Sequence, residues 1–140
     1  YDLFDLWPNH LFLLPNFGQE NINICSKLAD NILVLPENIR IIDILEYCNR
    51  FMTKPGYSSF CEALANSVGI HVFNRINFVE SEALIMGLKN YGNYRILQEN
   101  DFYEGRWELN QPLIASKNIS IDSDGALHAA QEIIRFIESL

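Results

Sequence analysis

One stretch of this chain combines residue types that bind anions with a local pattern that would position them. Residues 50–66, RFMTKPGYSSFCEALAN, begin with apolar residues suited to a buried strand end, and a Pro-Gly pair then stops the strand. Ser58 and Ser59 are typical helix N-caps, and Glu62 follows Ser59 at the spacing of a capping box. A helix that starts directly after a strand directs unpaired N–H groups and a positive dipole end toward the sheet edge. The run predicts a phosphate-binding turn, although a junction with nothing more than a helix cap gives the same pattern.

The elements around this turn follow from the alternation of short apolar runs with segments of helical spacing. Strands are expected at residues 10–15, 31–36, 51–54, 70–73 and 94–97, and residues 39–42 are either another strand or a loop that enters a short helix at 44–49. Longer helices are expected at residues 19–30, 59–67, 78–90, 101–113 and 125–140. The last of them would start after the cap Asp122 and would bury Leu127, Ile133, Ile134 and Ile137.

This alternation is typical of βαβ units, so we expect an α/β fold in which a Rossmann-like parallel sheet carries helices on both faces. The carboxyl ends of parallel strands meet at one edge of the sheet, where ligands collect. The turns at residues 54–59, 74–78 and 98–101 should therefore open on the same rim.

Length and composition restrict the class of protein. The chain has 140 residues, the size of one ordinary domain, and 49% of them are apolar, so a packed core is expected. The net charge of −8 argues against nucleic-acid binding, which uses a basic face. No apolar run approaches the about 20 residues that span a bilayer, so no membrane span is expected.

The cysteines indicate a reducing compartment. Their spacing at positions 25, 48 and 61 fits no zinc motif, and an odd number fits a disulfide framework poorly. Cys25 and Cys61 fall in apolar helical runs and are expected to be reduced core residues. We therefore expect a cytoplasmic protein.

The histidines give no indication of a metal site. His10, His71 and His128 are far apart in the sequence and form no ligand motif, so neither a metal nor a cofactor is expected. His71 falls within an apolar strand and is expected to be a hydrogen-bonded core residue.

A hydrolase is an alternative interpretation of the same turn. The residues from Gly56 to Phe60, with Ser58 at the centre, nearly form a nucleophile elbow, but Phe60 replaces the small last residue that the strained turn needs. An acid at position 122 or 124 followed by His128 has the right chain order, yet His128 falls within a predicted helix.

Residues 53–66, TKPGYSSFCEALAN, resemble the donor-side half of GT-B glycosyltransferases, above all the cyanobacterial-type glycosyltransferase-like proteins and the domain that precedes some sugar kinases. In that group the run is approximately Lys-Pro-Gly-Tyr-Gly-Thr-Phe-x-Glu-Ala. Residues 73–80, FNRINFVE, resemble the group's next strand and its Arg-x-x-Phe-x-Glu turn, and residues 38–43, NIRIID, resemble the segment that leads into the donor motif. The resemblance is close over residues 31–112 and extends to the rest only through the order of elements.

The resemblance implies a domain that binds a nucleotide-diphosphate sugar. The loop at residues 56–59 would face the diphosphate through its N–H groups, Glu62 would accept hydrogen bonds from ribose hydroxyls, and the turn at residues 75–82 would lie beside the sugar. No catalytic residue is expected on this half. The implied donor-binding residues are Lys54, Gly56, Tyr57, Ser58, Ser59, Glu62, Arg75, Phe78 and Glu80.

The resemblance also implies a second, amino-terminal half that carries the acceptor site and usually the catalytic base. A chain of 140 residues without a starting Met is expected to be one domain of a larger two-domain protein, inactive when isolated, with that acceptor domain as its partner. A homodimer through the uncovered face is a further expectation.

Three residues, Ser58, Ser67 and Gly69, depart from the family pattern and support an alternative function. Ser58 stands where the family has its second glycine, and residues 66–69, NSVG, replace an Asn-Gly-x-Pro turn. The alternative is a non-catalytic interaction module that has a GT-B-like fold and a degenerate donor site.

Overall fold

The computed structural model describes residues 3–16, 29–74, 77–117 and 124–139, and its strands form two small parallel sheets. In the first sheet β1 (Phe12–Leu14) pairs with β2 (Ile32–Val34). In the second, β3 (Arg50–Thr53), β4 (Gly69–Phe73) and β5 (Tyr94–Leu97) lie in chain order. The predicted α/β class with parallel strands is therefore confirmed, and every strand predicted outright is present. Residues 39–42 form no strand.

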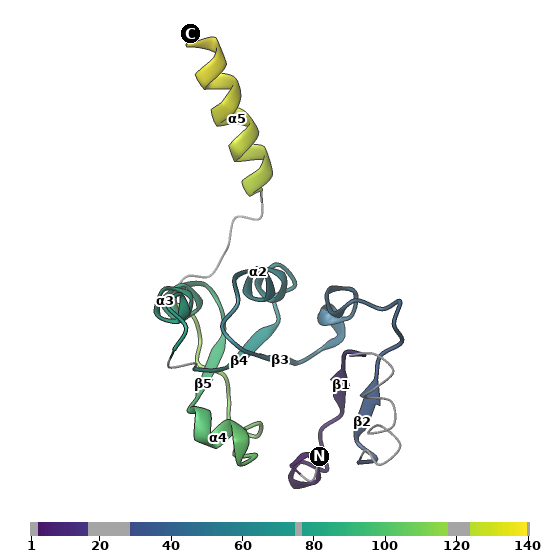
Figure 1. Ribbon diagram of the computed structural model, residues 1–140. Helices are drawn as coiled ribbons and strands as arrows, with labels where there is room; N and C mark the ends of the chain where they lie inside the picture. The colour runs from purple at the N-terminus through teal and green to yellow at the C-terminus, as the bar shows by residue number, and fades with distance from the viewer. Residues whose placement is uncertain (1–2, 17–28, 75–76, 118–123, 140) are drawn as a thin grey trace.

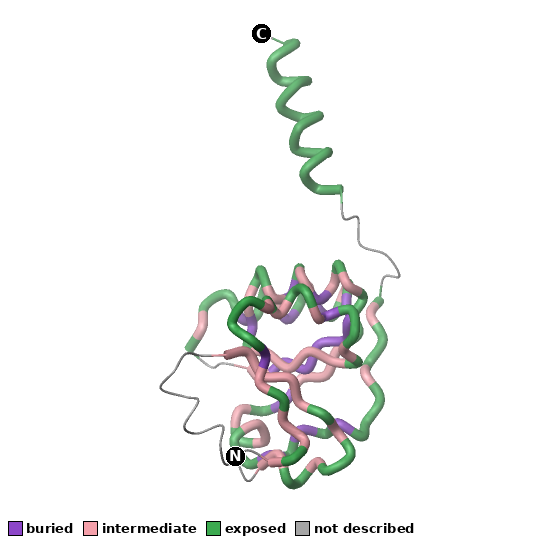
Figure 2. The backbone as a smooth tube through the Cα atoms, turned by 90° about the vertical axis from the view of Figure 1, so that its right-hand side faces the viewer, coloured by how far each residue is buried: buried purple, intermediate pink, exposed green. Residues whose placement is uncertain are grey.

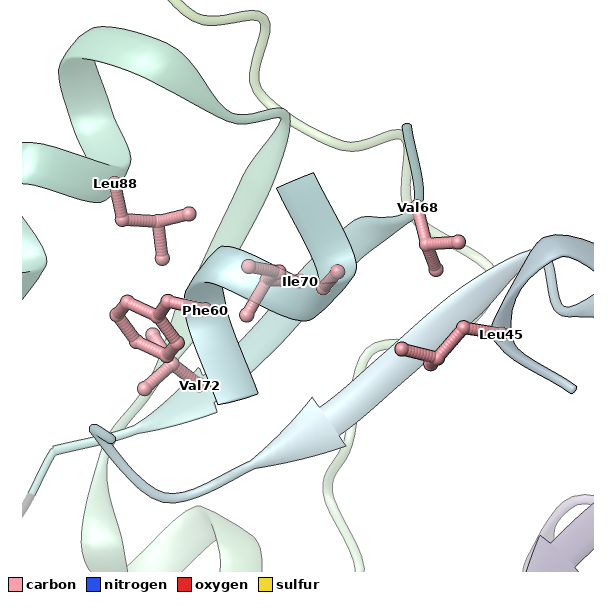
Figure 3. Packing of buried hydrophobic residues seen from close by; sticks show 7 residues of the cluster. Leu45, Phe60, Val68, Ile70, Val72 and Leu88 are labelled. Atoms are coloured by element: carbon pink, nitrogen blue, oxygen red, sulfur yellow. The ribbon is translucent and has the colours of Figure 1, made fainter. Parts of the chain in front are cut away.

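The connections between the strands of the second sheet are helical and lie on one of its faces (Figure 1). The helix α2 (Tyr57–Ala65) joins β3 to β4, and α3 (Ser81–Tyr91) joins β4 to β5. A 3-10 turn, η3 (Leu45–Tyr47), follows another, η2 (Ile41–Asp43), where a short helix was one of the expectations. Side chains from these elements form the core on this face (Figure 3), which consists of Leu45, Phe60, Ala63, Val68, Ile70, Val72 and Leu88.

The opposite face is covered by short elements rather than by long helices. Its core is formed by Leu97, Trp107 and Leu109, against which pack residues of η1 (Phe4–Leu6), β1, β3 and α4 (Glu99–Tyr103). The predicted helix at residues 101–113 is wrong beyond Tyr103. Gly105 and Glu108 adopt positive φ angles of 73° and 52°, which an α-helix cannot accommodate.

The irregular segment after α4 is fixed by its tryptophan contacts. The indole N–H of Trp107 donates to the carbonyl oxygen of Phe102 at 2.8 Å, and that of Trp7 donates to the carbonyl oxygen of Gly105 at 2.9 Å. The ring of Trp107 also contacts Phe4 and Phe12 edge to face. Packing of this large aromatic residue therefore favours a folded-back segment over a continued helix.

The last helix, α5 (Gly125–Glu138), stands apart from the packed part of the chain (Figures 1 and 2). Each of its residues is exposed, so the prediction of a buried side is wrong for Leu127, Ile133, Ile134 and Ile137. Its cap is Asp124, and Asp122 lies outside the described residues.

Two further sequence predictions concern side chains in helices. Cys61 in α2 is exposed, so the prediction that it is a core residue is wrong. Cys61 and Cys48 are both free thiols. Of the helix predicted at residues 19–30, only residues 29 and 30 are described. Cys25 lies outside the described residues. None of the helices within the described ranges is long and apolar enough to cross a membrane.

Candidate functional site

The turn between β3 and α2 has a backbone geometry suited to an anion. β3 ends at Thr53, Pro55 is buried, and Gly56 is the N-cap of α2 in an extended conformation, with φ −157° and ψ 128°. No side chain caps α2, which is described over its full length. The first N–H groups of a helix have no partner within it, so those at the start of α2 are available to an acceptor.

The predicted capping box is wrong. α2 begins at Tyr57, two residues before the predicted start, so Ser58 and Ser59 lie within its first turn. Glu62 is then in the middle of the helix, where its carboxylate cannot reach the N-cap amide. The tight Pro-Gly turn lets the helix begin earlier because Gly56 itself takes the N-cap position.

The side chains of the turn differ in exposure. Lys54 and Ser58 are exposed, and Tyr57 is 71% exposed, so its ring does not cover the start of α2. Ser59 and Glu62 are half-buried. A Cβ atom on Gly56 would lie 3.6 Å from Oγ of Ser59, an ordinary contact, so the fold itself does not require glycine here.

The neighbouring turn follows β4 and lies at the same edge because the strands are parallel. Glu80 is the exposed N-cap of α3, and the carbonyl oxygen of Phe78 accepts a hydrogen bond from the amide of Ser81 at 3.0 Å. Arg75 lies outside the described residues. Parallel pairing thus brings the turn at residues 54–59 and the turn before α3 to one sheet edge.

The nucleophile-elbow alternative lacks its partners. Ser58 is the second residue of α2 rather than the apex of a strained turn, and its φ is not among the positive values in the chain. His128 belongs to α5, which stands apart from this edge (Figure 1). Within the described ranges, no group of three His, Cys, Asp or Glu side chains could hold a metal ion.

A second polar set, which sequence reasoning missed, lies within the sheet on the face opposite α2 and α3. Arg50, His71 and Arg95 come from the three adjacent strands, and His71 pairs directly with Arg95 in the register. His71 is fully buried, and neither of its ring nitrogens has a hydrogen-bond partner among the described residues. His71 is therefore a core residue, as expected, but the expectation that it is hydrogen-bonded is wrong. Strand register would have placed the three side chains together, but it cannot be obtained from one sequence.

No model of a known protein family matches this chain, and no curated protein or solved structure matches it either.

Proposed function

We propose that this chain is the nucleotide-sugar donor-binding domain of a glycosyltransferase and that it is not catalytically complete alone. The observation that supports this most is the uncapped start of α2 directly after the Lys54-Pro-Gly turn, at the carboxyl edge of a parallel sheet. Diphosphates bind at such places because several backbone N–H groups and the helix dipole act on the same negative charge.

The proposed roles follow from position. The amides at residues 57–59 would donate to the diphosphate, and the exposed ammonium group of Lys54 would add a charge-assisted contact. Glu62, one helical turn further along, would accept hydrogen bonds from ribose hydroxyls. Phe78 and Glu80, before α3, would lie on the sugar side of the same edge. Arg75 belongs to the same proposed set through the sequence resemblance.

Titration with UDP, GDP and their sugars tests this function. Isothermal calorimetry would measure affinity, and amide NMR shifts would locate the ligand. We expect millimolar or tighter binding, with shifts concentrated at residues 56–62. The absence of heat and of shifts at those amides with millimolar ligand would contradict the proposal.

The second candidate function is a non-catalytic interaction module with a degenerate donor site. The serine at position 58, where the family has glycine, supports it, and so does α5, in which five large apolar side chains are more than half exposed: Leu127, Ile133, Ile134, Phe136 and Ile137. The substitution Ser58→Gly separates the two functions. If Ser58→Gly creates nucleotide binding that the natural chain lacks, the site is degenerate and the module interpretation holds.

A further inference from the structure

The second polar set consists of two half-buried arginines and a buried, neutral histidine, and several of their nitrogen atoms have no partner among the described residues. Arg50 is on β3, His71 on β4 and Arg95 on β5, all in positions that face the same side of the sheet. Nη1 of Arg50, Nε of Arg95 and both ring nitrogens of His71 are buried and have no hydrogen-bond partner within the described part of the chain. Buried polar groups are almost always paired, so each of these atoms needs an explanation.

Only part of the donor capacity of the arginines is used. Nη2 of Arg50 donates to the carbonyl oxygen of Gln111 at 2.6 Å, and Nη1 of Arg95 donates to Oε2 of Glu108 at 2.6 Å. The amide of Gln111 in turn donates to the carbonyl oxygen of Glu108 at 3.0 Å, so both arginines hold the ends of one turn.

The charges of this group do not balance. Two guanidinium groups face a single described carboxylate, that of Glu108, although the whole chain has a net charge of −8. Burial, and then the positive charges of Arg50 and Arg95, lower the pKa of His71 to about 4. Burial and then Arg95 also lower the pKa of Arg50. An excess of positive charge beside a neutral, buried imidazole is an environment that favours an oxyanion.

Glu108 is a weak internal counter-ion. Its side chain is 49% exposed, whereas that of Arg95 is 17% exposed. Its backbone adopts a φ of 52°, a left-handed conformation that is unfavourable for a residue other than glycine. A carboxylate that is half in water and held on a strained residue competes poorly with an added anion.

We propose that Arg50, His71 and Arg95 form a binding site for a phosphate group, separate from the donor edge. Guanidinium groups match phosphate oxygens in fork geometry, and a dianion would balance both arginines. The imidazole would contribute a third donor, and the bound phosphate would favour its protonated form. The charged groups that face His71 are Arg50 from β3, Arg95 from β5 and, through Arg95, Glu108 of the covering turn.

The site is distinct from the proposed donor site. Arg50 is the first residue of β3, at the end opposite the Lys54-Pro-Gly turn, and His71 is on the face that α2 and α3 do not cover. Nucleotide binding at residues 56–62 and phosphate binding at His71 can therefore succeed or fail independently.

NMR titration of the His71 imidazole in the full chain tests the proposal. We expect inorganic phosphate, compared with chloride at equal ionic strength, to raise the pKa of His71 from about 4 toward the ordinary value of 6.5. Acetate should have a smaller effect because its carboxylate has only two acceptor oxygens, whereas phosphate, a monoanion like acetate in this pH range, can offer more oxygens to the two guanidinium groups and the imidazole. An unchanged pKa of His71 in phosphate, or an equal effect of acetate, would overturn the proposal.

Variants separate a site from a general salt effect. Arg95→Lys keeps the charge and loses the fork, so phosphate affinity should fall about tenfold, the size of one charge-assisted hydrogen bond. Glu108→Gln removes the competing carboxylate and should strengthen binding several-fold. Glu132→Gln, on exposed α5, also removes one carboxylate, so it is the matched control and should change nothing. Equal phosphate responses in all of these proteins would mean an adventitious ion only. If Arg95→Lys does not fold, the contrast expected between Glu108→Gln and Glu132→Gln, which change the net charge equally, still decides the question.

Discussion

His71 on β4 lies directly opposite Arg95 on β5, and the guanidinium of Arg95 is bound in turn to Glu108 at 2.6 Å. The register therefore places a buried imidazole beside a cation whose own counter-ion is half exposed. The pKa of His71 therefore depends on burial and on the two arginines around it.

The first prediction concerns stability at acid pH without phosphate. Burial, and then Arg50 and Arg95, lower the pKa of His71 from 6.5 to about 4 in the folded chain. As the pH falls from 6.5 to 4, the unfolded chain binds a proton at this residue that the folded chain does not, so the free energy of unfolding decreases. The contribution of His71 to the free energy of unfolding is about 2–3 kcal/mol above pH 6.5, and it is lost by about pH 4.

Urea unfolding at several pH values, in a zwitterionic buffer with chloride, measures this loss. His71→Leu is the control because leucine has no titratable group and its apolar side chain suits a buried position in the strand. We expect the decrease between pH 6.5 and 4 to be smaller in His71→Leu than in the natural chain. Identical pH profiles for the two proteins would contradict the prediction.

The second prediction separates the fold from the ligand at the Pro-Gly turn. Gly56 has an extended backbone, and an added Cβ makes only ordinary contacts, the nearest at 3.6 Å. Gly56→Ala should therefore change the melting temperature little, because the restriction of the unfolded chain offsets the poorer preference of alanine for the N-cap position. The same methyl group would crowd a diphosphate at the helix start, so nucleotide affinity should fall about tenfold or more. Thermal unfolding and calorimetry of one sample measure the melting temperature and the nucleotide affinity. Unchanged affinity would mean that Gly56 is not part of the site.

The third prediction concerns Glu62, which does not cap a helix because it lies within α2. Because Glu62 lies within α2, Glu62→Gln should alter the free energy of unfolding by less than about 0.5 kcal/mol. If the carboxylate holds ribose hydroxyls, the same change should cost about 1.5–3 kcal/mol of nucleotide binding, the range for hydrogen bonds to a charged group. Nucleoside diphosphates with and without the 2′-hydroxyl provide the control, since the effect should depend on that group. Equal losses for both ligands would assign Glu62 a different role.

The sequence predicted the fold better than the site. Apolar runs bounded by Pro, Gly and Asn placed the strands correctly, because burial and backbone breakers are local properties. The end of α4 could not be predicted, since Trp107 is buried by residues near the N-terminus rather than by its neighbours. The amphipathic pattern of α5 predicts a buried face, but the pattern cannot say which surface would cover it.

The candidate residues show the same limit. The turn at residues 54–59 is contiguous, so its chemistry can be recognised from one stretch of sequence. Arg50, His71 and Arg95 are 21 and 24 positions apart (71 − 50 and 95 − 71), and only the parallel register brings them together. His71 consequently looked like an ordinary core residue.

The fourth prediction compares two glycines near the same helix. A Cβ on Gly92, at the end of α3, would lie 2.5 Å from Cδ2 of Leu64 and 2.8 Å from Cδ1 of Leu88. Gly92→Ala should destabilise the fold by about 1–3 kcal/mol because it overpacks the contact between α2 and α3. Within α3, a Cβ on Gly87 would meet nothing within 4 Å, so Gly87→Ala should stabilise the helix by about 0.5–1 kcal/mol. Denaturant unfolding measures the change in the free energy of unfolding for each variant. Changes of opposite sign would confirm the close packing of α2 against α3 at Gly92, whereas two stabilising changes would mean that the helices are further apart.

The fifth prediction tests whether α5 contributes to the stability of the sheets. Ile134 is 54% exposed and every residue of α5 is exposed, so Ile134→Lys removes no packing contact with the core. The free energy of unfolding should change by less than about 0.5 kcal/mol, as for most surface substitutions. Ile70→Ala is the matched control: this fully buried side chain belongs to the core beneath α2, and its truncation should cost about 2–5 kcal/mol. Urea unfolding of both variants measures the difference. A loss for Ile134→Lys approaching that of Ile70→Ala would show that α5 packs against the rest of the chain, and the exposed face would then no longer support the interaction-module candidate.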